Sequence, residues 1–198
     1  MFTITNDITN EIIIKNSKFI TIIHKINNVY EINSFLEQLK EKYKDATHYC
    51  YAYIIDEHKK FSDDNEPSGT AGNPIMQVLD KNNLQNIICV VIRYFGGIKL
   101  GAGGLIRAYS KSASECIKKG KLIELIQGYN VDIIFNYDYV NTINYLLKDK
   151  NIIQKSFNDN ITYNLNIDTN FYNNLINNNN IKINIIKEIL IEKEDINS

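Results

Sequence analysis

The sequence has few residues that would form disulfides, a structural metal site or a membrane-spanning helix. Its 198 residues include three cysteines, an odd number without a Cys-x-x-Cys pair, which speaks against a disulfide framework or a structural zinc site and favours a reducing compartment. No apolar run approaches the roughly 18 residues of a membrane-spanning helix, and Met1 is not followed by a basic segment and an apolar one. We therefore expect a cytoplasmic protein without a membrane partner.

An excess of charge of one sign is also missing. The 22 basic and 23 acidic residues leave a formal net charge of -1, so the surface as a whole does not attract nucleic acid or lipid, and any anion site must be a local patch. With 44% hydrophobic and 23% charged residues, the chain has the composition of an ordinary folded protein. The length allows one large domain or two small ones, at roughly 100–200 residues per domain.

Two domains are indicated by a change of character near Gly128. Residues 1–128 carry a net charge of +2 and all nine glycines, whereas residues 129–198 carry -3. The pattern of the second segment is strand, helix, two strands, helix and strand, a ferredoxin-like arrangement, and Asp168 is placed to cap a helix. We therefore predict domains at 1–128 and 129–198. The predicted strands of the second domain cover residues 129–135, 152–157, 161–167 and 181–191.

The first segment is also α+β. Its hydrophobic periodicity predicts a hairpin around Asn16 and Ser17, and a helix that has Asn73 as N-cap and Pro74 as first residue. Strands are predicted over residues 2–5, 11–15, 18–25, 48–55 and 87–93, and helices over residues 30–43 and 73–79. A further helix follows the glycines, and its predicted buried stripe is Leu105, Tyr109, Ala113 and Cys116.

The glycines are concentrated in one stretch of the first segment. Seven of the nine lie between Gly69 and Gly104, and the only prolines, Pro67 and Pro74, lie near the start of this stretch. Glycine is needed where the backbone takes a positive φ or approaches another group closely. We therefore look for the functional site here.

Within this stretch, residues 93–119 are predicted to form a buried strand, a glycine loop and the start of a helix whose exposed face carries Arg107 and Lys111. Residues 93–121 hold seven cations against Glu115 alone, a local net charge of +6. Exposed N–H groups at a helix N-terminus, together with nearby cations, favour binding of an anion. The predicted anion, nucleic-acid or partner-binding residues are Arg93, Tyr94, Gly96, Gly97, Lys99, Gly101, Gly103, Gly104, Arg107 and Lys111.

Other interpretations of this basic surface stay open, because a basic helix face can also be plain solvated surface or a docking face for an acidic protein. No Gly-Lys-Ser/Thr follows the four residues after Gly96, and Gly101 to Gly104 breaks the Gly-x-Gly-x-x-Gly pattern, so we expect no nucleotide cofactor. Tyr94 and Phe95 adjoin the loop, and either would be able to stack on a nucleic-acid base if it were exposed.

A second unusual segment covers residues 61–74. Its three carboxylates within four residues suit a hard cation, but Pro67 and Ser68 break the EF-hand pattern. We interpret the segment as a rigid loop whose side chains bond its own backbone, and we assign no metal. The candidate nucleophiles Cys50 and Ser68 lack a complete catalytic motif, and a buried cysteine is commonly inert, so no catalytic residue is assigned.

Four long segments of the chain resemble signatures of the Impact (YigZ-like) family. They are residues 16–20, 48–52, 61–75 and 91–109, which read NSKFI, HYCYA, FSDDNEPSGTAGNPI and VIRYFGGIKLGAGGLIRAY. Asn65 stands where the family has a glycine, and asparagine tolerates the left-handed region better than most residues. The residues of the family-motif loop are Asp63, Asp64, Glu66, Pro67, Gly69, Thr70 and Gly72.

The resemblance implies the two-domain bacterial form of the family. Its first α+β domain would be similar to a domain IV-type fold of elongation factor G, and its second would be ferredoxin-like. A pairing of this kind implies a translation-linked protein, and we predict a non-catalytic regulator that binds RNA, the ribosome or a translation-factor partner through the basic glycine loop. The alternative is an enzyme acting on a small phosphorylated or peptide substrate in a cleft between residues 63–72 and 96–104. The sequence leaves the choice between RNA and protein, and the oligomeric state, open.

Overall fold

The computed structural model describes residues 1–193 and divides into two compact units, Met1–Glu124 and the residues from Leu125 onward. The division lies slightly before the boundary predicted after Gly128, within strand β7 (Leu122–Phe135). Gly128 is an internal residue of that strand, paired with Asp168 on one side and Ile189 on the other. A Cβ at Gly128 would lie 2.7 Å from the Ile167 carbonyl oxygen, so this glycine serves close packing within a sheet.

The first unit is built on a five-stranded antiparallel sheet in the order β2-β3-β6-β4-β5. Its central strand β6 is an apolar run that is buried almost throughout, as expected for a strand covered on both faces. The strands are β2 (Ile8–Ile14), β3 (Ser17–Lys25), β4 (His48–Ile55), β5 (His58–Ser62) and β6 (Ile87–Tyr94). Strand β5 was not predicted, because its polar, lysine-containing sequence lacks an apolar alternation; such sequences are common at sheet edges.

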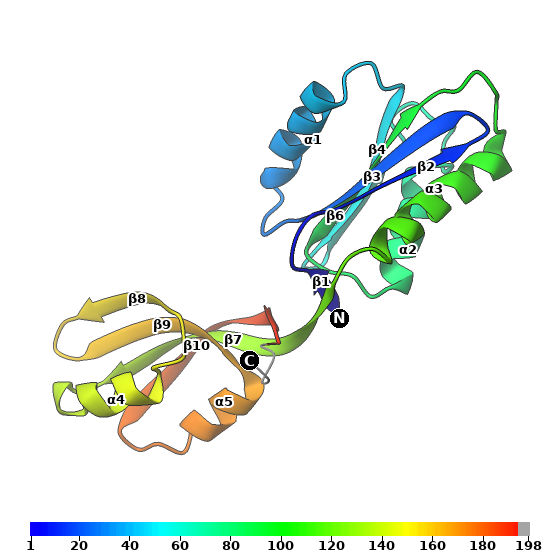
Figure 1. The fold of residues 1–198 in the computed structure, drawn as a ribbon. Coiled ribbons are helices and arrows are strands. Elements are labelled where there is room, and N and C mark those ends of the chain that lie inside the picture. Colours follow the sequence, from blue (N-terminus) through cyan, green and yellow to red (C-terminus); the bar gives the residue numbers. More distant parts are fainter. Residues whose placement is uncertain (194–198) are drawn as a thin grey trace. The chain divides into compact units, whose positions relative to one another are not determined.

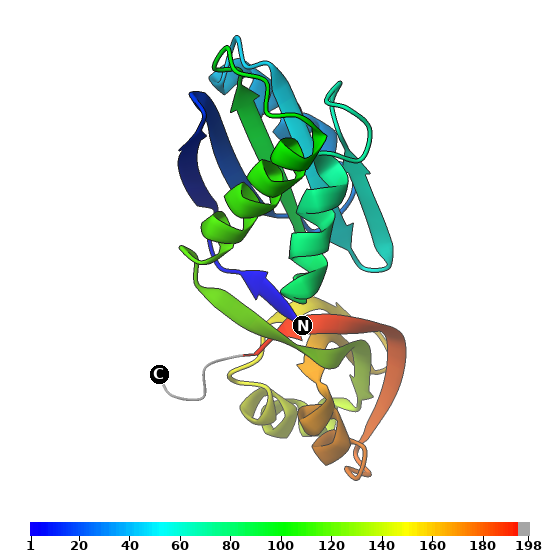
Figure 2. The same ribbon diagram turned by 90° about the vertical axis from the view of Figure 1, so that its right-hand side faces the viewer.

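Helices cover both faces of this sheet (Figures 1 and 2). Helices α2 (Gly72–Lys81) and α3 (Ala102–Ile117) pack on one face, and α1 (Glu31–Lys42) packs on the other. The predicted stripe of α3 is confirmed, since all four of its residues are buried in the core that α2 and α3 share with the sheet. That core includes Cys50 and Ala52 from β4, Cys89 and Val91 from β6, and Phe19 from β3.

The β2–β3 hairpin turns at Lys15 and Asn16, which both have positive φ, as a two-residue hairpin loop requires. The backbone of Gly96, at the start of the glycine loop, lies directly against this turn. A Cβ at Gly96 would be 2.1 Å from the carbonyl carbon of Asn16. Only glycine allows this approach, which anchors the first residue of the glycine loop on the hairpin.

The second unit has the predicted order of strands and helices. Its antiparallel strands are arranged β10-β7-β9-β8, and its helices cover one face of that sheet (Figure 1). After β7 come a 3-10 turn (Tyr137–Tyr139), α4 (Val140–Leu146), β8 (Ile152–Phe157), β9 (Ile161–Asp168), α5 (Thr169–Leu175) and β10 (Ile181–Glu192). The Asp168 carboxylate accepts the N–H of Phe171 at 2.8 Å, which confirms the predicted cap.

One short strand connects the two ends of the first unit's chain: β1 (Phe2–Ile4) pairs with residues Leu122–Glu124 at the beginning of β7. No helix within residues 1–193 has both the length and the apolar character needed to cross a membrane.

Candidate functional site

Asp63 organises the loop that leads into α2. One carboxylate oxygen accepts the N–H groups of Ala71 and Gly72 at 3.0 and 2.8 Å, and the other accepts the N–H of Gly69 at 2.8 Å. The predicted N-cap was therefore wrong: α2 begins at Gly72 and its first amides are satisfied by a residue nine positions earlier. Pro74 is instead the third helical residue, where a missing N–H still costs no intrahelical bond.

The rest of this loop bonds partly to its own backbone, as predicted, and partly to β4, which was not predicted. The Asp64 carboxylate accepts the N–H of Tyr49 at 2.6 Å, and the Asp64 carbonyl accepts the Nδ1–H of His48 at 2.8 Å. The Thr70 hydroxyl donates to the carbonyl of Pro67 at 2.6 Å. Asn65 has a φ of +66°, so the residue that departs from the family pattern does occupy the left-handed region.

Glu66 lies at the centre of a buried polar cluster that the sequence reasoning missed. Its side chain is 4% exposed, and its Oε1 accepts the Nη1–H of Arg93 at 2.5 Å and the hydroxyl of Tyr109 at 2.8 Å. The Nε2 of His48 lies 3.7 Å from the same oxygen. The loop, β6, α3 and β4 therefore meet at one carboxylate. A charged residue within the apolar strand at 87–93 was the available signal, because a buried arginine needs a partner.

Arg93 is consequently placed differently from the surface cation that the sequence predicted. Its side chain is 5% exposed, and its Nη2 lies 3.3 Å from the Ser17 hydroxyl. The guanidinium carbon lies 5.5 Å from the ring centroid of Phe19 and 5.5 Å from that of Phe95. The charge of Arg93 is balanced inside the molecule by Glu66, so Arg93 contributes little to attracting an anion from solvent.

Cys50 belongs to the same cluster and is fully buried. Its Sγ lies 3.3 Å from the Tyr109 hydroxyl and 3.0 Å from the Asp63 carbonyl. Burial raises the pKa of the Cys50 thiol, and burial likewise raises the pKa of the Tyr109 phenol. The raised pKa favours the protonated thiol, and the burial expected for a packing cysteine is present.

The glycine loop itself lies at the surface. Gly97, Lys99, Gly101 and Gly103 are exposed, and Gly97 and Gly101 have φ values of +82° and +70°. No described heavy atom lies within 4 Å of a Cβ added at either of those two glycines. Their requirement for glycine is therefore conformational, unlike the steric requirement at Gly96.

Helix α3 begins in this loop without a side-chain cap of its own. Gly101 is the N-cap residue and has no side chain with which to accept the first amides. The first N–H groups of a helix have no intrahelical acceptor, so those of Ala102 and Gly103 face the surroundings of the loop. Gly104 packs closely, since its Cβ would lie 3.1 Å from Cβ of Leu100.

The predicted cations do not all gather at this helix start. Lys99 is exposed in the loop, and the Arg107 guanidinium folds back, with Nη1 3.7 Å from a Cβ placed at Gly103. Lys111 lies one turn further, with its Nζ 3.7 Å from the Glu115 carboxylate.

Tyr94 points to the other face of the sheet, where it packs with the α1 core and its hydroxyl donates to the Lys44 carbonyl at 3.2 Å.

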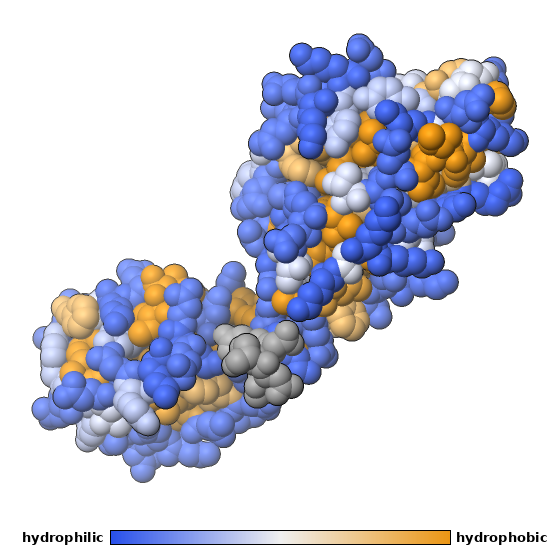
Figure 3. Space-filling model, in the orientation of Figure 1, coloured by the Kyte–Doolittle hydropathy of each residue, from blue (hydrophilic) through white to orange (hydrophobic). Residues whose placement is uncertain are grey.

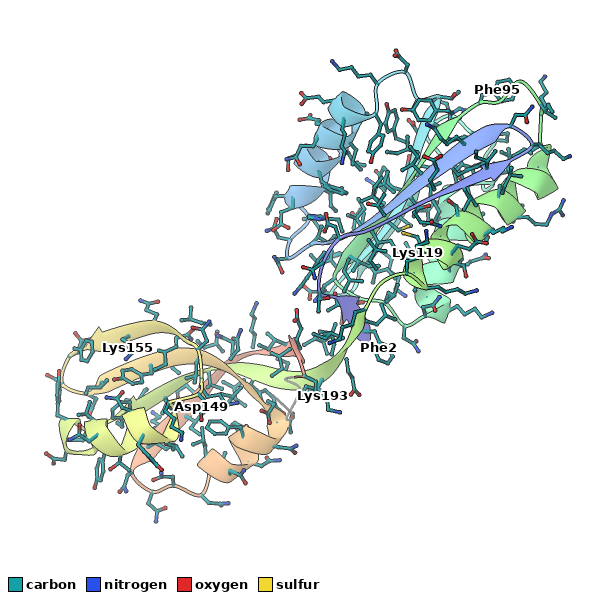
Figure 4. All side chains as sticks on the ribbon, viewed as in Figure 1. Phe2, Phe95, Lys119, Asp149, Lys155 and Lys193 are labelled. Carbon is teal, nitrogen blue, oxygen red and sulfur yellow. The ribbon has the colours of Figure 1, made fainter. Side chains whose placement is uncertain are left out.

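The remaining lysines of the basic region lie at the far end of α3. Figure 4 places Lys119 beyond the end of the helix that is remote from Phe95. A helix of 16 residues is about 24 Å long, more than twice the Debye length of about 8 Å at physiological salt. The local charge of +6 is therefore spread along the helix, and Lys99 and Arg107 supply most of the field at the glycine loop.

Within residues 1–193, no group of three or more His, Cys, Asp or Glu side chains is arranged to hold a metal ion.

In comparisons with known proteins, the segment that contains these residues matches a family model. The family described as the Impact N-terminal domain matches residues 15–117, a range that contains the hairpin turn, the buried cluster and the glycine loop. A crystal structure described as that of an hypothetical protein superposes with a TM-score of 0.72 at 26% identity, over 94% of this chain and 97% of that one.

Curated relatives carry the same family name. The IMPACT family member YvyE of Bacillus subtilis is 46% identical over 126 residues, which cover 62% of this chain and 58% of that protein. The IMPACT family member YigZ of Escherichia coli is 38% identical over 111 residues, 54% of each chain. The Thermus thermophilus member is 34% identical over 140 residues, 71% of this chain and 76% of that protein. The matched segment thus spans little more than half the length of the Bacillus and Escherichia relatives.

Proposed function

This chain belongs to the Impact family, and from that premise we propose that it is a non-catalytic, translation-linked regulator that binds RNA or the ribosome. The contact surface is the glycine loop, residues 96–104, together with the first turns of α3. The observation that carries this proposal is the exposure of an uncapped helix start beside two cations, Lys99 and Arg107. Amides and cations in this arrangement suit a phosphate oxygen.

The expected strength of this surface is modest. The helix dipole contributes about 0.3–1 kcal/mol to binding of an anion, so the two cations supply much of the attraction. For a single-stranded nucleic acid, two neutralised phosphates correspond to a slope of about -1.4 in a plot of log affinity against log salt concentration. Binding should therefore weaken visibly with salt.

The bonding of the family-motif loop favours binding over the enzymatic alternative. That alternative needed Asp64, Glu66 or Thr70 as groups available to a substrate. Instead, Asp64 accepts a backbone amide, Glu66 is paired with Arg93 and Tyr109, and the Thr70 hydroxyl donates to a carbonyl. These side chains therefore have a structural role, because they hold the loop in its conformation.

The finer fold assignments remain predictions. The βαββαβ order of the second unit and its sheet order β10-β7-β9-β8 support the ferredoxin-like assignment. For the first unit, the similarity to a domain IV-type fold of elongation factor G rests on the family resemblance.

The test compares a double charge reversal at the loop, Lys99→Glu with Arg107→Glu, with a matched reversal on the opposite face of the same unit, Lys40→Glu with Lys42→Glu. Both pairs are exposed and change the net charge equally. Titration against single-stranded RNA at several salt concentrations should show lost affinity and a slope smaller by about 1.4 for the loop variant only.

Two results would decide against the proposal. Equal, salt-insensitive binding by wild type and both variants would refute a phosphate site at the loop. Loss of an acidic protein partner in the loop variant, with RNA binding unchanged, would assign the surface to protein docking instead.

A further inference from the structure

We propose that the exposed ring of Phe95 is a stacking platform for an unpaired base of single-stranded RNA, an inference that rests on the function proposed above. Phe95 follows β6 directly and begins the segment that leads into the glycine loop. Phe95 is 47% exposed, whereas Phe19 and Arg93 are buried. In Figure 4 it lies at the tip of the first unit, and Figure 3 shows apolar surface at that end.

The ring of Phe95 is the exposed member of a group of three side chains that reaches into the core. The guanidinium carbon of Arg93 lies 5.5 Å from the ring centroid of Phe19, which is fully buried, and 5.5 Å from that of Phe95. A cation within about 6 Å of a ring is attracted by its π electrons. One side of Phe95 is thereby supported from within, and the exposed part of the ring is left to solvent.

Hydrogen bonds hold the buried Arg93 and the backbone around Phe95 in place. Arg93 is bound by Glu66 and lies near the Ser17 hydroxyl, which also accepts the N–H of Gly96 at 3.2 Å. The N–H of Phe95 donates to the Thr47 hydroxyl at 3.0 Å, and the N–H of Thr47 donates to the Arg93 carbonyl at 2.7 Å. The backbone on each side of Phe95 is therefore held, so that presenting the ring costs little conformational entropy on binding.

A nucleobase fits this platform better than an apolar protein surface does. Bases stack on aromatic side chains in single-stranded complexes, where a basic groove holds the backbone, and every base has a π face to offer. Phe95 is followed within twelve residues by Lys99, the uncapped start of α3 and Arg107, which suit the phosphates adjoining a stacked base. The buried Arg93 then has a positioning role: it supports the aromatic ring rather than contacting phosphate.

The absence of tryptophan from the sequence gives a direct test. Phe95→Trp introduces a single fluorophore at the platform, and Phe157→Trp introduces one at a phenylalanine of similar exposure, 58%, in the second unit. Each variant is titrated with oligoadenylate RNA and with inorganic polyphosphate, which has the charge but no bases. We expect saturable quenching of the Phe95→Trp variant by oligoadenylate only, and none for Phe157→Trp.

Phe95→Leu supplies the affinity measurement, because leucine keeps apolar bulk but has no π face. It should weaken oligoadenylate binding about fivefold or more and leave polyphosphate binding unchanged. Circular dichroism and the thermal midpoint verify that the variants are folded, which is expected at a half-exposed position.

The outcomes separate this inference from the function on which it rests. If wild type binds RNA through Lys99 and Arg107 but Phe95→Trp is not quenched, or Phe95→Leu binds as wild type does, the platform is refuted and the proposed function stands. Quenching by polyphosphate as strong as by oligoadenylate would also refute stacking. If wild type binds no RNA, both proposals fail.

Discussion

The two glycine-containing loops of the first unit, residues 63–72 and 96–104, differ in their hydrogen bonding. In the first loop, carboxylates accept the loop's own amides and a buried arginine, and the Thr70 hydroxyl donates to a carbonyl of the loop. In the second, an exposed backbone leads to a helix start that has a glycine as N-cap. A loop bonded to itself contributes stability, whereas an exposed helix start without a side-chain cap presents its first amides to a ligand. The comparison predicts that substitutions in the first loop affect folding and that those in the second affect binding.

The largest effect is expected for Glu66→Ala. This change leaves the buried guanidinium of Arg93 unpaired, which should lower the free energy of unfolding by about 3–5 kcal/mol. Urea denaturation measures the difference. Lys99→Ala in the other loop is the control and should stay within about 0.5 kcal/mol of wild type. If Glu66→Ala unfolds with the same free energy as wild type, the first loop does not have the structural role assigned to it.

Asp63→Asn should have the next largest effect. The substitution keeps the shape of the side chain but removes the charge that accepts three backbone amides, and a hydrogen bond to a charged group contributes about 1.5–3 kcal/mol. We expect a lower unfolding midpoint together with faster amide exchange at residues 69–72. Asp159→Asn, in the exposed β8–β9 turn, controls for loss of an aspartate charge. Unchanged exchange at 69–72 would mean that Asp63 does not hold the loop.

Two adjacent glycines of the second loop allow the comparison to be sharpened. Gly96→Ala would force a Cβ against the backbone of the β2–β3 turn and should cost about 3 kcal/mol, the upper range for overpacking. Gly97→Ala meets no described atom within 4 Å and should cost only about 1 kcal/mol, from its positive φ. Thermal unfolding of both variants measures the difference. Equal costs would show that the approach to the hairpin is not tight.

The smallest difference concerns cations along α3. Arg107→Glu should reduce the salt slope of RNA binding by about 0.7, the value for one phosphate on a single strand. Lys111→Glu should change it far less, because Lys111 already has the Glu115 carboxylate 3.7 Å away. Fluorescence titration across a salt series distinguishes the two. An equal loss for both would place the ligand along the helix face and not at the loop.

Periodicity predicted the regular elements well. The buried stripe of α3, the limits of β4 and the strand–helix order of the second unit follow from the spacing of apolar residues, which is a local property. Strand β5 escaped prediction because an edge strand with Lys59 and Lys60 has little apolar surface to bury. Its pairing with β4 depends on backbone hydrogen bonds, which leave no signature in side-chain hydropathy.

The positions of the charged side chains were harder to predict from the sequence. Arg93 and Lys99 are both cations near the glycine loop, yet one is buried and the other exposed. The difference depends on Glu66, which is 27 residues from Arg93 in sequence and reaches it only because the loop before α2 folds onto β6. The predicted N-cap of α2 failed for the same kind of reason, since Asp63 occupies the cap from outside the helix.

The amino-acid sequence by itself determined most of the strands and helices, which face of α3 is buried, and where the unusual backbone lies. Only the tertiary structure decided that Arg93 supports the ring of Phe95 from inside, that Tyr94 faces the other way, and that the carboxylates of the first loop are already used. The physical reason is that burial patterns arise from neighbours three or four positions apart, whereas the partner of a charge is set by whichever distant segment the fold brings within hydrogen-bond distance.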